Sequence, residues 1–225
     1  MDSCVQVIHH FFLTRYGVYC VVFNMECLIH DDEETRTRCL DTLKFWVNSI
    51  VVHTFNPQTT ETAPIAFVGT RKDVVSNPAH HERISAVLYD NFSMSSAWPS
   101  VIKNENGIGE NDKTEFCFFP VDNTKSRADP QVTHLLQDIE RVIDNSDYVH
   151  QEQPLVYLQT IDKLVSLAKP CFSYEEVSRV AQMCGVDKDG VTAMLKLFHD
   201  MGTVMFHGIA TVFVFMHGAS VRVYM

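Results

Sequence analysis

The sequence predicts an α/β protein, with a small parallel sheet of three strands and its helices, followed by a mostly helical portion. Two observations lead to this fold class. In the first half, almost unbroken apolar runs alternate with segments whose apolar residues recur every three or four positions. In the last third, the helical spacing gives way to short segments rich in β-branched residues. With 225 residues, 46% of them hydrophobic, the chain has enough apolar material for two cores.

Three apolar runs predict the strands. They cover residues 17–25 (GVYCVVFNM), 63–68 (APIAFV) and 115–121 (EFCFFPV). Continuous runs of this kind are typical of strands that are buried on both faces. Because a helical pattern follows each run, we expect three adjacent parallel strands, with the first at an edge of the sheet. The polar stretch 93–113 predicts a long surface loop.

Each strand is followed by a predicted helix. The first helix begins at the acidic cluster DDEE, residues 31–34, because carboxylates are favoured at a helix N-terminus. The apolar faces of the three helices include Leu43, Val47 and Ile50, then Ile84, Leu88 and Phe92, then Leu135, Ile139 and Val142.

The last third predicts a winged helix. A helix follows Pro154, and Ser173 and Glu176 form a capping box that begins the next one. Another helix ends at Gly202, and short β segments fill residues 203–216. Helix, helix and then hairpin is the order of a winged helix. The net charge is −9 over residues 1–150 and −1 over residues 151–225, so we place a domain boundary near residue 150.

Composition excludes several classes of function. A net charge of −10 argues against nucleic acid or an anionic membrane as a partner. No apolar run reaches the ~18 residues that span a bilayer, and no signal peptide is evident. Seven cysteines without a CxxC pair fit reduced thiols. The histidine pairs lack further ligands at metal-binding spacing. We therefore expect a soluble cytoplasmic protein without a metal site.

The segment FVGTRKD predicts a binding loop at the carboxyl end of a buried strand. The carboxylate of Asp73 could accept hydrogen bonds from N1 and the 2-amino group of guanine, which adenine cannot donate. Thr70 would tie this loop to its neighbours, and the stem of Arg71 could lie against the purine. The next strand would bring Asp122 and Asn123 to the same edge. The same spacing also fits a turn in which Asp73 caps the following helix.

In this order and spacing, HHFFLTRYGVYCVVFNME, FVGTRKD and FFPVDNTKS resemble the second half of a Roc domain, the Ras-like GTPase module of Roco proteins. Residues 153–206, including SYEEVSRVAQMCGV, resemble the start of the COR domain that follows Roc. The resemblance implies a truncated Ras-like sheet in a partial Roc domain, residues 1–150. A winged-helix-like, N-terminal COR portion would occupy residues 151–225.

The resemblance also implies binding of GTP or GDP with Mg²⁺, protein partners and a homodimer formed through COR. In some Roco proteins a kinase is attached, but no kinase motif occurs here. The phosphate-binding string GxxxxGK[ST] does not occur in the 225 residues, and no D-x-x-G precedes Gln6. We therefore expect the phosphate and magnesium sites to be missing and the chain to be a fragment without catalytic residues of its own.

Three functional hypotheses remain. The first is a regulatory and protein-interaction part of a Roco-type intracellular signalling protein, without GTPase activity of its own. The second is a guanine-nucleotide-binding GTPase module that a missing segment or a partner completes. The third is a winged-helix adaptor. Under all three we expect no DNA binding, because Lys196 is the only Lys or Arg in the predicted recognition helix.

Overall fold

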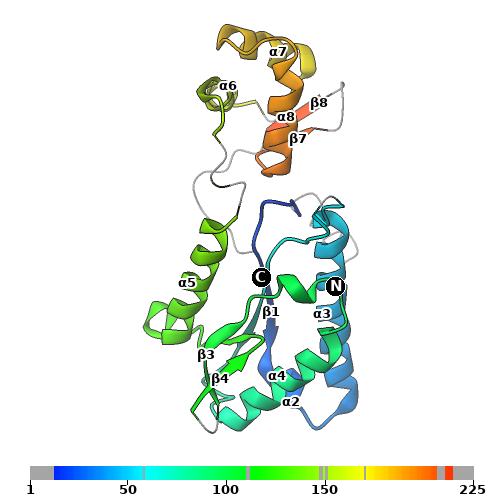
Figure 1. Ribbon diagram of the computed structural model, residues 1–225, viewed down its shortest axis with the longest axis vertical. Helices are drawn as coiled ribbons and strands as arrows, with labels where there is room; N and C mark the ends of the chain where they lie inside the picture. Colours follow the sequence, from blue (N-terminus) through cyan, green and yellow to red (C-terminus); the bar gives the residue numbers. More distant parts are fainter. Residues whose placement is uncertain are drawn as a thin grey trace. The chain divides into compact units, whose positions relative to one another are not determined.

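The computed structural model describes residues 13–57, 59–109, 112–146, 149, 152–169, 171–206 and 211–214 (Figure 1). They form two compact units. Of the described residues, the first unit covers those from 17 to 149, and the second joins residues 13–16 with those from 152 onward. Residues 13–16 were expected in the first domain, residues 1–150. In the structure Thr14 lies beside Gly202, where an added Cβ would be 3.3 Å from the Thr14 methyl carbon.

The first unit contains the predicted parallel sheet. Strands β1 (Tyr19–Asn24), β2 (Ile65–Thr70) and β5 (Phe119–Pro120) lie in the order β1-β2-β5, with every pair parallel. Within this three-stranded sheet β1 is at one edge. The prediction of adjacent parallel strands is confirmed. The third strand is shorter than predicted, because residues 115 and 116 pair with a different segment.

The prediction of a surface loop over residues 93–113 was wrong. This stretch contains the short 3₁₀ helix η2 (Trp98–Ser100) and strand β3 (Asn104–Gly109), which pairs antiparallel with β4 (Asp112–Phe116). The side chains of Asn104 and Phe116, which face each other across the hairpin, are fully buried. The sequence pattern did not predict the hairpin, because β3 consists largely of polar and glycine residues. Its stability comes from packing against the rest of the unit rather than from an apolar pattern.

Helices cover both faces of the parallel sheet. They are α2 (Met25–Ile29), α3 (Glu33–Thr54), α4 (Pro78–Phe92) and α5 (Pro130–Asp144). On one face, Phe67 of β2 packs against Phe92 of α4, with ring centroids 5.1 Å apart. On the other face, Ala66 and Val68 share a core with Leu135 of α5. Figure 1 shows α3 and α5 on opposite sides of the strands.

The acidic cluster has the structural role that the sequence predicted. Asp32 is the N-cap of α3, and its carboxylate accepts a hydrogen bond from the amide of Thr35 at 2.9 Å. Glu33 and Glu34 occupy the first turn, where the helix dipole favours negative charge. The cluster therefore needs no functional explanation.

The second unit combines helices with a small antiparallel sheet. Its elements are α6 (Leu155–Ser166), β6 (Cys171–Ser173), α7 (Tyr174–Met183), α8 (Gly190–Asp200), β7 (Val204–Phe206) and β8 (Thr211–Val214). The strands lie in the order β6-β8-β7. Residues 204–206 and 211–214 are strands, as predicted, whereas β6 was not expected and residues 215–216 lie outside the described part. None of the described helices is both long and apolar enough to cross a membrane.

The predicted capping box at the start of α7 is present. The Ser173 hydroxyl accepts a hydrogen bond from the amide of Glu176 at 3.1 Å, and the Glu176 carboxylate accepts one from the amide of Ser173 at 2.9 Å. At the other end, Gly185 adopts a left-handed φ of 93°, which stops the helix at little steric cost. Between the two ends of α7, Val177 and Ala181 are buried in the core of the unit.

Candidate functional site

Two loops meet at the carboxyl edge of the parallel sheet. Residues 71–75 follow β2, and residues 121–125 follow β5. The amide of Val121 donates a hydrogen bond to the carbonyl of Gly69 at 2.7 Å, and the amide of Lys72 donates one to the carbonyl of Val121 at 3.3 Å. Ligands of open α/β sheets bind at this edge. The parallel pairing of β2 and β5 therefore brings the two predicted binding loops side by side.

Thr70 and Arg71 fix the start of the first loop. The Thr70 hydroxyl donates a hydrogen bond to the carbonyl of Phe23 at 3.0 Å, which joins the end of β2 to β1. Arg71 has a left-handed φ of 69°, an unfavourable conformation for a residue with a side chain. Its guanidinium lies 3.3 Å from the carboxylate of Glu26 in α2. The side chain of Arg71 is half exposed, so its stem lies at the surface of the site.

Asp73 lies in the turn after Arg71, and its side chain is exposed. The turn is closed by the amides of Val74 and Val75, which donate to the Arg71 carbonyl at 3.0 and 2.9 Å. Asp73 does not cap the next helix. The N-cap of α4 is Asn77, whose side-chain oxygen accepts from the amide of Ala79 at 3.0 Å. The capping role that the spacing allowed for Asp73 is therefore ruled out.

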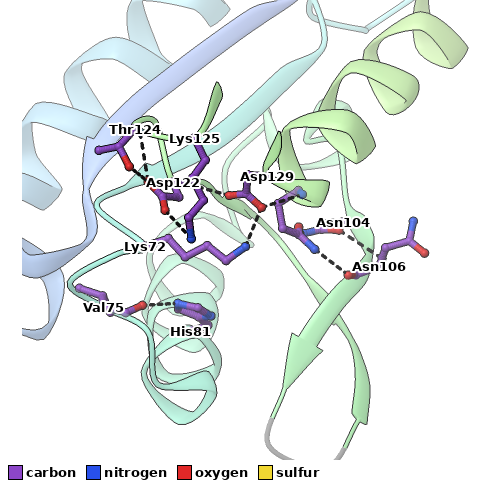
Figure 2. A network of polar contacts seen from close by, with 10 residues as sticks. Lys72, Val75, His81, Asn104, Asn106, Asp122, Thr124, Lys125 and Asp129 are labelled. Carbon is purple, nitrogen blue, oxygen red and sulfur yellow. Dashed lines mark hydrogen bonds and ion pairs between the residues drawn. The ribbon is translucent and has the colours of Figure 1, made fainter. Parts of the chain in front are cut away.

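The carboxylate of Asp122 is buried and bonded within its own loop (Figure 2). One oxygen accepts hydrogen bonds from the amide and the hydroxyl of Thr124, at 3.1 and 2.6 Å. The other lies 3.1 Å from Nζ of Lys125. The Thr124 and Lys125 hydrogen bonds lower the pKa of Asp122. Asp122 therefore shapes the loop, whereas the neighbouring Asn123 is exposed at its tip.

Lys125 is a residue of the site that the sequence analysis did not single out. Its pKa is raised, chiefly by the hydrogen bond and charge of Asp122, with smaller contributions from Asp129 and Asp73. Lys125 adds a hydrogen-bond donor to this edge, where Arg71 and Lys72 also lie.

Asp129 was also missed. It precedes α5 as its N-cap, and its side chain is only 3% exposed. The carboxylate accepts hydrogen bonds from the amide of Asp122 at 2.7 Å, from Nζ of Lys72 at 2.9 Å and from the amide of Gln131 at 3.0 Å. An Asp-Pro pair before an apolar helix predicts a cap from sequence. No pattern in the residues next to Asp129 predicts its contacts with the two loops.

His81 supports the first loop through a hydrogen bond to its backbone. The imidazole is buried, and its Nε2 donates a hydrogen bond to the carbonyl of Val75 at 2.6 Å. The ring lies edge-on to Phe116 and Phe118, with ring centroids 6.4 Å apart in each pair. Burial lowers the pKa of His81. The neutral ring therefore acts as a fixed donor beneath the turn.

The exposed polar side chains at this edge of the sheet can form hydrogen bonds with a ligand. Over residues 13–206, where the structure describes them, and 211–214, no group of three His, Cys, Asp or Glu side chains is placed to hold a metal ion. Asp73 offers acceptors at the surface, and Lys125 offers a donor. These groups can pair with the edge of a planar heterocycle, and the stem of Arg71 can cover its face.

No protein-family model matches the chain, and no curated protein matches it. Among solved structures it resembles RocCORdC of Roco2 from Methanosarcina barkeri, determined bound to GDP, with a TM-score of 0.61. The fold of this chain is similar to that of a Roc-COR structure. The match covers 94% of this chain and 53% of that chain, at 15% sequence identity. The predicted Roc-COR resemblance is thus confirmed for the fold, and the chain spans about half the length of this Roc-COR neighbour.

Proposed function

We propose that the chain is a regulatory and protein-interaction part of a Roco-type signalling protein. In this proposal the first unit is a partial Roc domain that carries the guanine-base side of a nucleotide site. The second unit is the N-terminal part of a COR domain with a winged helix. The likeness to a GDP-bound Roc-COR structure supports the proposal.

The observation that carries the base-side assignment is the exposed carboxylate of Asp73 on a turn locked against residues 121–125. Guanine donates from N1 and its 2-amino group toward such a carboxylate, whereas adenine presents no matching pair of donors. A carboxylate held in place by its turn therefore favours a base that presents two donors to it over a base that does not. Arg71 and Asn123 would line the base, and Asp122 would hold the second loop in shape.

We expect the chain alone to bind GDP weakly and not to hydrolyse GTP. Contacts with phosphate and Mg²⁺ supply much of the affinity of such sites, and GxxxxGK[ST] does not occur in these 225 residues. A base site alone has little free energy left after the entropic cost of association. The dissociation constant for GDP should therefore be well above micromolar.

Titration of the full chain with GDP, and separately with ADP, followed by amide chemical shifts, tests this proposal. GDP should shift amides of residues 71–75 and 121–125, and ADP should not. Asp73→Asn should abolish the preference for GDP, whereas Asp90→Asn, an exposed carboxylate of α4, should keep it. A submicromolar constant for GDP would contradict weak binding, and unchanged shifts in both loops would contradict a base site.

One observation favours a GTPase module that another segment completes. In the described sheet, β1 lies at the edge, and its side chains of Cys20 and Val22 are exposed, Val22 to 52%. An edge strand presents unpaired backbone groups, with which a strand of another segment can pair. GTP turnover by a mixture of the chain with a phosphate-loop segment, absent from either alone, would favour this second function.

We also propose that the protein acts in the cytoplasm through protein partners, including a second copy of itself bound through the COR part. Light scattering over a range of protein concentrations tests the second copy. A mass of one chain at all concentrations would contradict the dimer. If GDP shifts no amide and protein partners still bind, the result favours the third function, a winged-helix adaptor.

A further inference from the structure

The two oxygens of the Asp129 carboxylate hold different loops (Figure 2). Oδ2 accepts a hydrogen bond from the amide of Asp122, in the loop that follows β5, at 2.7 Å. Oδ1 accepts one from Nζ of Lys72, in the loop that follows β2, at 2.9 Å. One side chain therefore fixes both loops relative to the start of α5.

Burial makes these contacts strong. The side chain of Asp129 is 3% exposed and that of Lys72 is 28% exposed, whereas the surface pair Glu34 and Arg38 is more than three-quarters exposed on both sides. Burial alone would raise the pKa of Asp129. The hydrogen bonds of Asp122, Lys72 and Gln131 outweigh it, so the pKa is lowered and the carboxylate stays charged.

A second set of contacts fixes Asp129 itself. The amide of Gln131, in the first turn of α5, donates to Oδ1 of Asp129 at 3.0 Å. The side chain of Gln131 accepts from Nδ2 of Asn104 at 2.8 Å and donates to the carbonyl of Asn106 at 2.9 Å. Asn104 is fully buried in the β3-β4 hairpin. The hairpin thus anchors the helix start on which both loops depend.

We propose that Asp129 is a positioning residue that sets the separation of the two base-binding loops. The inference rests on the proposed guanine site. Lys72 precedes Asp73 in the chain, and Asp122 precedes Asn123, so the carboxylate acts one residue away from each exposed group that would meet the base. Asp129 itself is buried beneath the loops and acts through them.

Amide hydrogen exchange of the full chain tests the positioning role. In Asp129→Asn an amide NH2 group replaces one carboxylate oxygen and the negative charge is lost. One acceptor oxygen then remains for the two donors, the amide of Asp122 and Nζ of Lys72. Exchange should accelerate about tenfold or more, as expected for the loss of a charge-assisted hydrogen bond. The reporters are the amides of Val74 and Val75 in one loop and of Thr124 and Lys125 in the other, all hydrogen-bonded within their loops.

Two further variants make the test specific. Lys72→Met removes only one contact and should accelerate exchange at residues 74 and 75 more than at 124 and 125. Asp138→Asn is the matched control, because Asp138 is also a buried carboxylate of α5 but pairs with Arg141. It should leave exchange in both loops at the wild-type rate, whatever its effect on global unfolding.

Titration with GDP separates the two proposals. Faster loop exchange together with a weaker GDP response in Asp129→Asn supports the positioning role. If the wild type shows no GDP response, the base site is overturned. Faster loop exchange in Asp129→Asn would then still support the contact of Asp129 with both loops. Wild-type exchange at all four amides in Asp129→Asn overturns the positioning role, whatever GDP does.

Discussion

A Cβ atom on Gly69 would lie only 2.6 Å from Cγ of Met25. The ring of Phe118 is also close, at 2.9 Å from the same position. Both neighbours are fully buried, so neither has room to move freely. Glycine is needed here because β2 passes tightly beneath the start of α2, one residue before Thr70. The strand that presents the first loop is therefore held by close packing.

Gly69→Ala should lower the free energy of unfolding by about 1–3 kcal/mol, the usual cost of overpacking a core. Urea denaturation of the full chain measures this loss. In a Met25→Ala background the clash with Met25 is removed and only that with Phe118 remains, so the same substitution should cost less. Equal losses in the two backgrounds would show that the contact with Met25 is not the cause.

Stability should fall as the pH drops below the ordinary pKa of histidine, 6.5. Burial lowers the pKa of His81, so the unfolded chain takes up a proton more readily than the folded one. The contribution of His81 is complete above pH 6.5 and is lost as the pH falls through the lower folded value. Urea midpoints between neutral and mildly acidic pH should therefore decline.

His81→Gln should make this decline shallower, although the variant starts from a lower stability at neutral pH. His80→Gln changes the neighbouring, less buried histidine and should keep a slope close to that of the wild type. If His81→Gln retained the full wild-type slope, another group would be responsible for the pH dependence.

Ser173→Ala should destabilise the second unit by about 1 kcal/mol, because the amide of Glu176 loses its capping partner. Ser178 lies within the same helix, where its hydroxyl accepts a hydrogen bond from the side chain of Gln182 at 3.1 Å. Ser178→Ala is thus the matched control and should have little effect. Thermal unfolding of the two variants gives the comparison, and equal shifts would contradict a specific cap.

The second unit should not bind DNA. Helix α8 carries Lys196 as its only Lys or Arg, and its apolar residues Met194, Leu195 and Phe198 are buried in the core. Binding to duplex DNA depends on clustered positive charge and weakens steeply with salt. A mobility-shift assay should show no salt-dependent complex with the wild type. A complex that Lys196→Glu abolishes would overturn this expectation.

Much of the fold could be read from local patterns. The apolar runs around Val21, Phe67 and Phe119 predicted the parallel strands, and the spacing of Leu43 and Leu135 predicted helices that cover them. The helix starts at Asp32 and Ser173 could also be predicted, because a capping side chain bonds to an amide two or three residues away. These patterns involve residues that are close together in the sequence, so a single sequence is enough to recognise them.

The site was decided by contacts between distant residues. The sequence placed Asp73 and Asp122 at the same edge of the sheet, but in the structure the Asp122 carboxylate is bonded to Thr124 and Lys125 of its own loop. Asp129 reaches Lys72 across 57 positions of the chain. Composition gives no sign of such a contact, because it exists only when parallel strands bring two loops to one edge of a sheet.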